Sequence, residues 1–433
     1  MNDTQPINTQ HHLDTTTSWF RTAAPYIHAH RGATFVIAFD GETIDTGGFD
    51  ALLHDIAILN SLGIKLVLVY GARPQIEQQC HLLDIKVQYH RGLRITDDAS
   101  LNVAKNVIGK LRLDIESKLS YGLPHTPMAD ARIRCTSGNL VTARPAGILD
   151  GIDLGHTGEV RRIDIEGINQ QLGLGNIVLL PPLGYSLTGE VFNLSAEAIA
   201  TAVATVLRAD KLIFIGQSNR ELPRELTLSQ ARENLSAHPS IPAAVSACES
   251  GVKRVHLLDR SLDGALLQEL FSRDGAGTLL TATSFETTRQ ATIEDVGGIL
   301  ELLQPLEANG TLVKRSRELL EREIGHFTVM ERDGSVIACA ALYAYPENQM
   351  AELACLAVSS TYQSSGRGQQ LLNSLEQIAR NAGINSLCVL TTQTAHWFLE
   401  HGFKPAEISD LPIAKQALYN YQRNSRVFRK QLS

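Results

Sequence analysis

Two glycines, Gly366 and Gly368, stand in a polar loop where a helix is predicted to begin. Residues 356–358 before the loop are typical of a strand end, and residues 371–372 after it are typical of the first buried turn of a helix. A helix N-terminus carries unsatisfied N–H groups and a partial positive charge. Glycines there let a large anion approach the backbone, and Arg367 would add a charge. The loop therefore predicts a phosphate cradle, with an ordinary helix cap as the alternative.

A second candidate is Glu352, which lies in the apolar run MAELACLAV just before this loop. A charged side chain in such a run is costly to bury unless it is paired or has a function. A carboxylate beside a reacting group can accept a proton from it. The alternative is a glutamate at the end of a strand that points into solvent.

Composition limits the class of protein. The chain has 433 residues, which is too many for one hydrophobic core and predicts two or three domains. A hydrophobic content of 43% is typical of globular proteins, and the net charge of −7 does not favour nucleic-acid binding. The six cysteines are scattered singly without CxxC spacing, so we expect no metal. The polar N-terminus and the lack of a long apolar run predict a cytoplasmic protein without a membrane segment.

Strands and helices alternate through the first part of the chain. Apolar strands are predicted within 34–39, 64–70, 176–180 and 211–216, and amphipathic or Ala-rich helices within 49–63 and 195–210. This alternation is typical of a mostly parallel sheet that is covered by helices on both faces. We therefore predict an α/β domain with three αβα layers over residues 1–280.

A smaller unit is predicted after a change of composition. Residues 281–290 are rich in Thr, Ser and charge and are interpreted as a linker. Residues 291–433 then predict an α+β domain with a mixed sheet, in which a hairpin turns at Asp333-Gly334. The strand 350–358 leads into the glycine loop and its helix, and a further strand and a short helix follow.

The order of these elements around the loop QSSGRG resembles the GNAT N-acetyltransferase superfamily, whose signature is Q/R-x-x-G-x-G/A. In that superfamily the loop holds the pyrophosphate of acetyl-coenzyme A. The preceding strand diverges from its neighbour, and the arm of the coenzyme pairs with the exposed backbone. The resemblance implies acetyl-CoA as a co-substrate and no permanently bound cofactor. The implied contact residues are Cys355, Leu356, Val358, Gln363, Ser364, Ser365, Gly366, Arg367 and Gly368.

The same resemblance implies direct transfer of the acetyl group to an amine. Glu352 is then the expected general base, and Cys355 is expected to be a small buried hydrophobe and not a nucleophile. Many relatives protonate the leaving thiolate with a tyrosine, but this chain has Trp397 and Phe398 at the matching positions. Thr391 is the expected thiolate partner instead, with an ordinary strand-end threonine as the alternative.

Basic residues lie near both ends of the smaller unit. Arginine binds carboxylates through two hydrogen bonds, so such residues beside an acetyl donor suit a substrate that carries carboxylates. A solvated helix face is the alternative for any one of them. The predicted substrate-binding residues are Lys314, Arg315, Arg317, Arg423 and Arg426.

The larger domain resembles the amino acid kinase family, and acetylglutamate kinases in particular, through FVIAFDGETID, VLVYGARPQIEQ and GLRITDDASL. The resemblance also shows departures. Ala38 stands near the expected lysine, Asp40-Gly41 replaces a glycine pair, and Ala72 and Arg73 replace glycines. We expect kinase activity to be lost, because the lysine charge is gone and side chains would crowd the phosphates.

Some kinases of that family are sensitive to arginine and bind it toward the C-terminal side of the domain. The segment LLDRSLDGALLQELFSRDGAGTLL resembles their arginine region. The resemblance implies Glu269 as the partner of the guanidinium, and the backbone of Gly275, Ala276 and Gly277 as the wall of the pocket. Without the resemblance, an exposed helix carboxylate would be an equally good interpretation of Glu269.

The two domains in this order resemble the bacterial N-acetylglutamate synthases. The implied reaction transfers acetyl from acetyl-CoA to the α-amine of L-glutamate, the first step toward arginine, with feedback inhibition by L-arginine. The resemblance also implies a homo-oligomer, with a hexamer as the suggested form, and no nucleic-acid or membrane partner is expected. The alternatives are an arginine-sensing protein with a weak or silent acetyltransferase domain and a bifunctional kinase–acetyltransferase.

Overall fold

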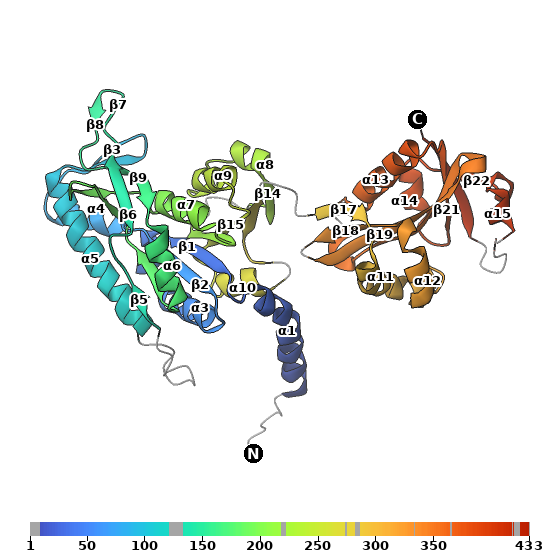
Figure 1. Ribbon diagram of the computed structural model, residues 1–433, viewed down its shortest axis with the longest axis horizontal. Coiled ribbons are helices and arrows are strands. Elements are labelled where there is room, and N and C mark those ends of the chain that lie inside the picture. The colour runs from blue at the N-terminus through green and yellow to red at the C-terminus, as the bar shows by residue number, and fades with distance from the viewer. Residues whose placement is uncertain are drawn as a thin grey trace, which may run out of the picture. The chain divides into compact units, whose positions relative to one another are not determined.

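The computed structural model describes residues 9–120, 133–217, 222–272, 275–281, 286–332, 334–363, 366–417, 419 and 425–432. The chain divides into two compact units, Met1–Thr283 and Ser284–Ser433 (Figure 1). Each unit has its own sheet and its own hydrophobic core.

The described part of the first unit contains an eight-stranded sheet with the order β14-β16-β15-β13-β1-β2-β10-β5. Neighbouring strands in it run parallel except for β15 and β16. Its strands are β1 (Thr34–Phe39), β2 (Lys65–Tyr70), β5 (Cys135–Thr136), β10 (Ile177–Leu180), β13 (Lys211–Gly216), β14 (Glu225–Thr227), β15 (Arg254–Asp259) and β16 (Thr278–Thr281). The central strands are apolar almost throughout because helices cover both of their faces.

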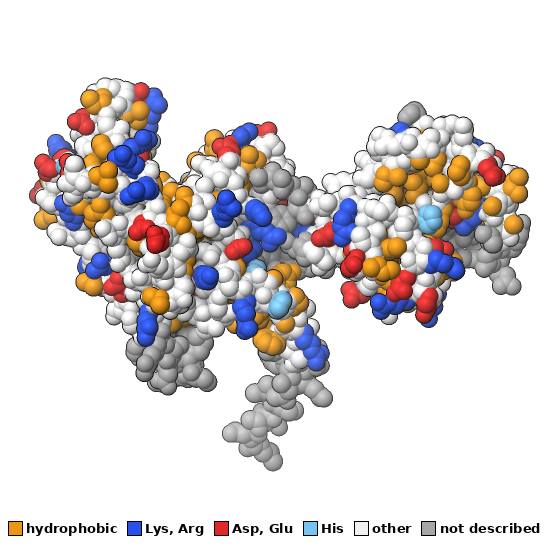
Figure 2. Space-filling model, in the orientation of Figure 1, with side chains coloured by type: hydrophobic (Ala, Val, Ile, Leu, Met, Phe, Trp, Pro, Cys, Tyr) orange, Lys and Arg blue, Asp and Glu red, His pale blue; other side chains and the backbone are white. Residues whose placement is uncertain are grey.

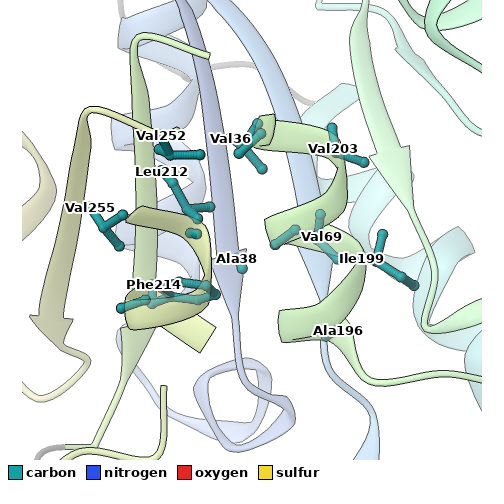
Figure 3. Packing of buried hydrophobic residues seen from close by; sticks show 14 of the residues in the cluster. Val36, Ala38, Val69, Ala196, Ile199, Val203, Leu212, Phe214, Val252 and Val255 are labelled. Atoms are coloured by element: carbon teal, nitrogen blue, oxygen red, sulfur yellow. The ribbon is translucent and has the colours of Figure 1, made fainter. Parts of the chain in front are cut away.

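Successive residues of β1 point to opposite faces of this sheet. Val36 and Ala38 pack against one set of helices, whereas Phe35 and Ile37 pack against the other set. Figure 3 shows the first face, where Ile199 of α7 lies among the buried side chains. That face carries α6 (Ile165–Gly173), α7 (Ala196–Leu207), α8 (Leu228–Glu233) and α9 (Ile241–Glu249). The other face carries α1 (Thr9–His30), α3 (Phe49–Ser61), α4 (Arg73–Leu82), α5 (Asp98–Ser120) and α10 (Ala265–Phe271). The predicted three-layer αβα architecture is confirmed.

Smaller elements complete the first unit. A second sheet has the order β12-β11-β6-β9, and two short hairpins are β3-β4 and β7-β8. These elements are α2 (Gly41–Asp45), β3 (Gln88–His90), β4 (Leu93–Ile95), β6 (Val141–Pro145), β7 (Ile148–Leu149), β8 (Ile152–Asp153), β9 (Gly158–Ile163), β11 (Leu183–Tyr185) and β12 (Val191–Asn193).

The second unit is built on a mixed sheet that has seven strands in its described residues, in the order β17-β18-β19-β20-β21-β23-β22. They are β17 (Glu286–Gln290), β18 (Phe327–Arg332), β19 (Ser335–Tyr345), β20 (Met350–Val358), β21 (Ser386–Thr391), β22 (Lys404–Ala406) and β23 (Arg426–Gln431). One face packs against α13 (Arg367–Asn381) and α14 (Ala395–Glu400), and the other against α11 (Val296–Ala308) and α12 (Arg317–Glu323). The helix α15 (Ile413–Gln416) and five 3-10 turns, Ile293–Asp295, Ile324–His326, Pro346–Asn348, Ser360–Tyr362 and Ile408–Asp410, complete the described elements. The predicted α+β unit with a mixed sheet is confirmed.

The segment 281–290, which the sequence indicates as a linker, differs in the structure. Glu286–Gln290 form β17, which pairs antiparallel with β18 at the edge of the second sheet. Residues 282–285 lie outside the described residues. The polar sequence ETTRQ does not predict a strand, because an edge strand that is partly exposed needs few apolar residues. In the described parts of the chain, no helix is long and apolar enough to cross a membrane.

The packing of α7 predicts a difference between two of its residues. Ile199 is fully buried, whereas Val206 on the same helix is 39% exposed. We expect Ile199→Ala to lower the free energy of unfolding by about 2–4 kcal/mol, because it leaves a cavity against the sheet. Val206→Ala is the matched control and should cost less than about 1 kcal/mol. Guanidinium denaturation of the full chain measures both values, and equal costs would contradict the described packing.

Candidate active site

The strands β20 and β21 are paired over only part of their length. Their parallel register runs from Met350 opposite Ser386 to Glu352 opposite Cys388. The other edge of β20 stays paired with β19 as far as Val358. After Glu352, the backbone of β20 therefore has an edge that is not paired with β21 along its described length. An extended ligand can pair with such an edge as an added strand.

A bulge lies in β20 just after this point. Cys355 has a φ of +54°, and the register between β19 and β20 shifts between Cys339 and Ala341. A bulge bends its strand and increases the local twist, which helps β20 to leave the direction of β21. Burial raises the pKa of the Cys355 thiol to about 11. The thiol is therefore protonated near neutral pH and is a poor nucleophile.

Glu352 is the last residue of β20 that pairs with β21, and it is only 7% exposed. Its neighbours Ala351 and Leu353 pack with the α13 face, so Glu352 points to the opposite face. There its Oε1 lies 2.8 Å from Nζ of Lys415 on α15, and Tyr345 of β19 hydrogen-bonds to it. The structure thus places this carboxylate inside the fold, beside a cation, where the two strands part.

Thr391 shares one face of β21 with Leu387 and Val389, which pack with α13. It therefore lies on the sheet face opposite to that of Glu352. Its Oγ1 is 2.8 Å from Oγ1 of Thr394 and accepts a hydrogen bond from the amide of that residue at 3.1 Å. A longer bond of 3.4 Å comes from the amide of Gln393. These contacts close the turn from β21 into α14, so Thr391 has a structural role in this turn.

Glycine is required at the two loop positions 366 and 368 for different structural reasons. Gly366 is the N-cap of α13 with a φ of +75°, and it offers no side-chain cap for the first amides of the helix. A Cβ at Gly368 would lie 3.3 Å from the indole of Trp397, so this glycine lets the side chain pack closely. Gln363 donates from Nε2 to the carbonyl of Val358 at 3.1 Å and ties the loop to the end of β20. The uncapped N-terminus of α13 is suited to an anion. The predicted contact residues Ser364 and Ser365 lie outside the described residues.

The side chain of Arg367 is mostly buried and packs inside the second unit. Its guanidinium pairs with Glu286 of β17 at 2.5 Å and lies 4.7 Å from the ring centroid of Tyr362. The arginine side chain is only 13% exposed. Its charge is therefore partly balanced by Glu286. At an anion site, this residue would act mainly through its backbone amide.

Among the basic residues that the sequence suggests for the substrate, Arg315 is the half-buried one. It hydrogen-bonds to Tyr343, which lies directly opposite Glu352 in the register of β19 and β20. Arg317 is 71% exposed and forms an ion pair with Glu321 one turn along α12. Figure 2 shows acidic and basic side chains interspersed over the α11–α12 region, as on a solvated surface. Lys314 and Arg426 are also exposed, and Arg423 lies outside the described residues.

In the first unit, the carboxylate of Glu269 holds the loop that follows α10. Its Oε2 accepts hydrogen bonds from the amides of Ala276 at 2.7 Å and Gly277 at 2.8 Å. A Cβ at Gly275 would lie 2.4 Å from the same oxygen. The other oxygen lies 2.6 Å from Nδ1 of His256. The structure thus brings together the four residues that the sequence indicates for an arginine pocket.

His256 and Lys211 are two charged or titratable neighbours of Glu269 that the sequence did not reveal. Burial, and next the charge of Lys211, lower the pKa of His256 to about 4. The neutral imidazole donates from Nδ1 to Glu269, and its Nε2 faces Nζ of Lys211 at 3.4 Å. Burial opposes the ionisation of Glu269, but the bonds from His256 and the two amides lower its pKa to about 2. No spacing signal marks this set, because its members come from α10 and from the adjacent strands β13 and β15.

The carboxyl ends of the parallel strands are the usual place for a nucleotide in such a sheet. At this edge Asp40, just after β1, pairs with Arg260, just after β15, at 2.6 Å. The carboxylate of Asp40 also caps α2 by accepting a hydrogen bond from the amide of Thr43. A Cβ at Gly71 would lie 2.9 Å from the amide nitrogen of Gly41, so the two turns pack tightly.

Comparison with known proteins gives the family. The amino acid kinase family model matches residues 33–259, and the acetyltransferase (GNAT) family model matches residues 298–403. An amino-acid acetyltransferase of Pseudomonas putida (strain GB-1) is 50% identical over 96% of this chain and 99% of its own length. The chain belongs to the amino-acid acetyltransferase family. A member from Azotobacter vinelandii is 51% identical with the same coverage.

Solved structures agree with this family. A crystal structure of N-acetylglutamate synthase from Neisseria gonorrhoeae, complexed with coenzyme A and L-arginine, matches with 38% identity and a TM-score of 0.87. A structure of the same enzyme with coenzyme A and N-acetyl-glutamate matches with a TM-score of 0.60. Both matches cover 96% of this chain and 99% of the other. The resemblance to bacterial N-acetylglutamate synthases is thereby confirmed, and the chain is an amino-acid acetyltransferase.

The helix α1 carries a buried histidine next to α10, and this predicts a pH dependence. The Nε2 of His30 lies 2.9 Å from the carbonyl of Leu270, and burial, followed by the charge of Lys211, lowers the pKa of His30 from 6.5 to about 4. In the unfolded chain the imidazole binds a proton more readily. The stability that His30 contributes is therefore complete above pH 6.5 and is lost as the pH falls from 6.5 toward 4.

We expect His30→Gln to make the melting temperature less dependent on pH in this window. His28 on the same helix is exposed, so His28→Gln is the matched control and should leave the pH dependence unchanged. Thermal melts of the full chain between pH 4 and 7 give the answer. Equal slopes for wild type and His30→Gln would show that this imidazole is not held neutral by the fold.

Proposed function

We propose that this acetyltransferase moves the acetyl group of acetyl-CoA to the α-amine of L-glutamate. The observation that carries the proposal is the parting of β20 and β21 at a buried glutamate, with an uncapped helix N-terminus after β20. The match over 96% of the chain to a synthase that binds coenzyme A and N-acetyl-glutamate supports the choice of substrates. The product would be the first intermediate toward arginine.

The coenzyme would lie along the unpaired edge of β20. Its arm would pair with the backbone of residues 355–358, and its pyrophosphate would meet the first amides of α13 at Gly366 to Gly368. Gln363, Ser364 and Ser365 would line the same loop. The thioester would then reach the end of the paired region, next to Glu352.

The transfer needs a free amine. One proton of the substrate ammonium would pass to Glu352, directly or through a water, and the nitrogen would attack the thioester carbon. A C–N bond forms, the C–S bond breaks, and a second proton of the nitrogen goes with the leaving thiolate. The hydroxyls of Thr391 and Thr394 share one hydrogen bond, which uses only one of their two hydrogens. The other hydroxyl hydrogen could form a hydrogen bond to the thiolate. Thr391 therefore stays our candidate for the thiolate partner.

The carboxylates of glutamate would meet basic side chains. Arg315 is the strongest of these candidates among the described residues, because Tyr343 holds it on the face of Glu352. Lys314, Arg317 and Arg426 would contribute at the rim, where an exposed charge has a smaller effect. Arg423, outside the described residues, stays a candidate from the sequence.

The first unit would be regulatory and bind L-arginine as a feedback inhibitor. Glu269 and the loop 275–277 would form the site, and arginine would have to compete with or rearrange the contacts that Glu269 makes to His256. We also propose a homo-oligomer, because Trp19 and Phe20 on α1 are 52% and 60% exposed. A hexamer and a cytoplasmic location follow from the resemblance alone.

The first experiment measures thiol release from acetyl-CoA with each amino acid, with and without arginine. We expect release with L-glutamate that arginine suppresses. Glu352→Gln should lower kcat by about 10²–10⁴-fold while coenzyme A binding, measured by calorimetry, persists. If no amino acid gives release while arginine still raises the melting temperature, the chain is an arginine-sensing protein with a silent transferase unit.

A second experiment tests the arginine site. Glu269→Gln should weaken arginine inhibition about tenfold or more, because the charged partner of the guanidinium is lost. Gln268→Ala is the matched control, since Gln268 is the exposed neighbour on α10. Arginine inhibition that is unchanged in Glu269→Gln, at normal uninhibited activity, would rule out this pocket.

A further inference from the structure

A lysine far along the chain from Glu352 is held against its carboxylate. Lys415 lies on α15, and its Nζ is 2.8 Å from Oε1 of Glu352. Both side chains are mostly buried, at 22% and 9% exposure. The cation is therefore placed beside this carboxylate by the fold and is not a mobile surface chain.

The position of α15 is fixed by its own small cluster. Leu411, just before the helix, is buried with Met350, Cys388 and Val427 on the Glu352 face of the sheet. Gln416 donates from Nε2 to the carbonyl of Leu411 at 2.6 Å and closes the turn. Because Met350 and Cys388 are neighbours of Glu352 in the strand register, this cluster delivers Lys415 to the place where β20 and β21 part.

Other titratable groups also surround Glu352. Tyr345 of β19 and Cys388 of β21 both face it, and burial raises the pKa of each to about 12. Cys355 on the same strand has a pKa raised to about 11 by burial. Arg429 on β23 lies opposite Cys388 in the strand register, and its guanidinium donates to Oγ of Ser386 at 3.2 Å. The tyrosine and the two thiols thus stay neutral between pH 5 and 9, so they do not compensate the charge of Glu352.

Arg315 also lies on this face. It hydrogen-bonds to Tyr343, which is the partner of Glu352 in the register of β19 and β20. Its backbone amide donates to Glu307 at 3.0 Å, and Tyr343 donates from its hydroxyl to Glu323 at 2.7 Å. The backbone of Arg315 is thus held by Glu307, and its side chain meets Tyr343, which is itself bonded to Glu323. Lys415 remains the cation in direct contact with the Glu352 carboxylate in the described residues.

We propose that Lys415 is a positioning residue for the transfer, which pairs with the Glu352 carboxylate and holds it beside the gap between β20 and β21. This inference rests on the proposed function. Removing one partner of a buried ion pair leaves an uncompensated charge, and a carboxylate in that state takes up a proton more readily. A protonated Glu352 cannot accept the proton of the substrate ammonium. Lys415 acts through Glu352, and it gives no proton and forms no bond in the step.

The test is the pH profile of kcat/KM for thiol release by the full chain, with acetyl-CoA and L-glutamate. We expect Lys415→Met to move the acid limb of the profile upward by about one pH unit or more. On the acid limb, activity should fall about tenfold for each pH unit of this shift, and it should recover as the pH rises. Lys415→Arg keeps the charge and should restore most of the activity. Lys404→Met, at an exposed lysine on β22, is the matched control and should leave the profile unchanged.

Other results would overturn the inference. A uniform loss of activity at every pH in Lys415→Met would mean a merely structural role. A raised KM for glutamate with an unmoved acid limb would mean that Lys415 binds a substrate carboxylate instead. If Lys415→Met does not fold, Lys415→Gln is used, and the same shift of the acid limb is required of it. A wild-type chain without thiol release would overturn the proposed function and this inference together, whereas an active wild type with unshifted variants overturns the inference alone.

Discussion

The candidate active site of the second unit depends on one constraint, the end of the hydrogen-bonded ladder between β20 and β21 at Glu352. A parallel pair that continued past this residue would satisfy its own N–H and C=O groups and leave no edge for a ligand. The bulge at Cys355 works in the same direction, because a left-handed residue within a strand bends it away from its neighbour. Glu352, the open edge and the N-terminus of α13 then follow one another along a single strand and the loop after it.

Buried charge pairs are the second theme of both units. A carboxylate inside a protein needs a cation or several hydrogen bonds, and each of the buried carboxylates discussed above has them. Glu286 holds Arg367 at the loop, and Glu269 holds two amides and His256. These pairs fix loops, whereas the pair of Glu352 with Lys415 lies where the strands part. The same physical requirement thus serves structure at two positions and, in our proposal, chemistry at the third.

The first unit keeps the framework of the amino acid kinase family, with its own set of charged side chains at the carboxyl edge of the sheet. Its sheet and layers are those that the amino acid kinase family model describes. At the carboxyl edge, however, Asp40 and Arg260 pair with each other across the ends of β1 and β15. In our proposal this unit serves regulation through a different surface, the loop that Glu269 holds.

The sequence by itself determined the α/β architecture of the first unit and the α+β architecture of the second, because apolar runs of strand length and helix periods are local patterns that depend on few distant contacts. It also determined the glycine loop, since a left-handed Gly366 before a helix is a local requirement, and it marked Glu352 as a charge in an apolar run. It misjudged Glu286–Gln290, because a polar edge strand resembles a linker. Only the tertiary structure decided that Lys415 meets Glu352, that Arg367 turns to Glu286 and that His256 joins Glu269 to Lys211. These partners lie on different elements, and side-chain pairing across a fold leaves no period or spacing in the chain that could reveal it.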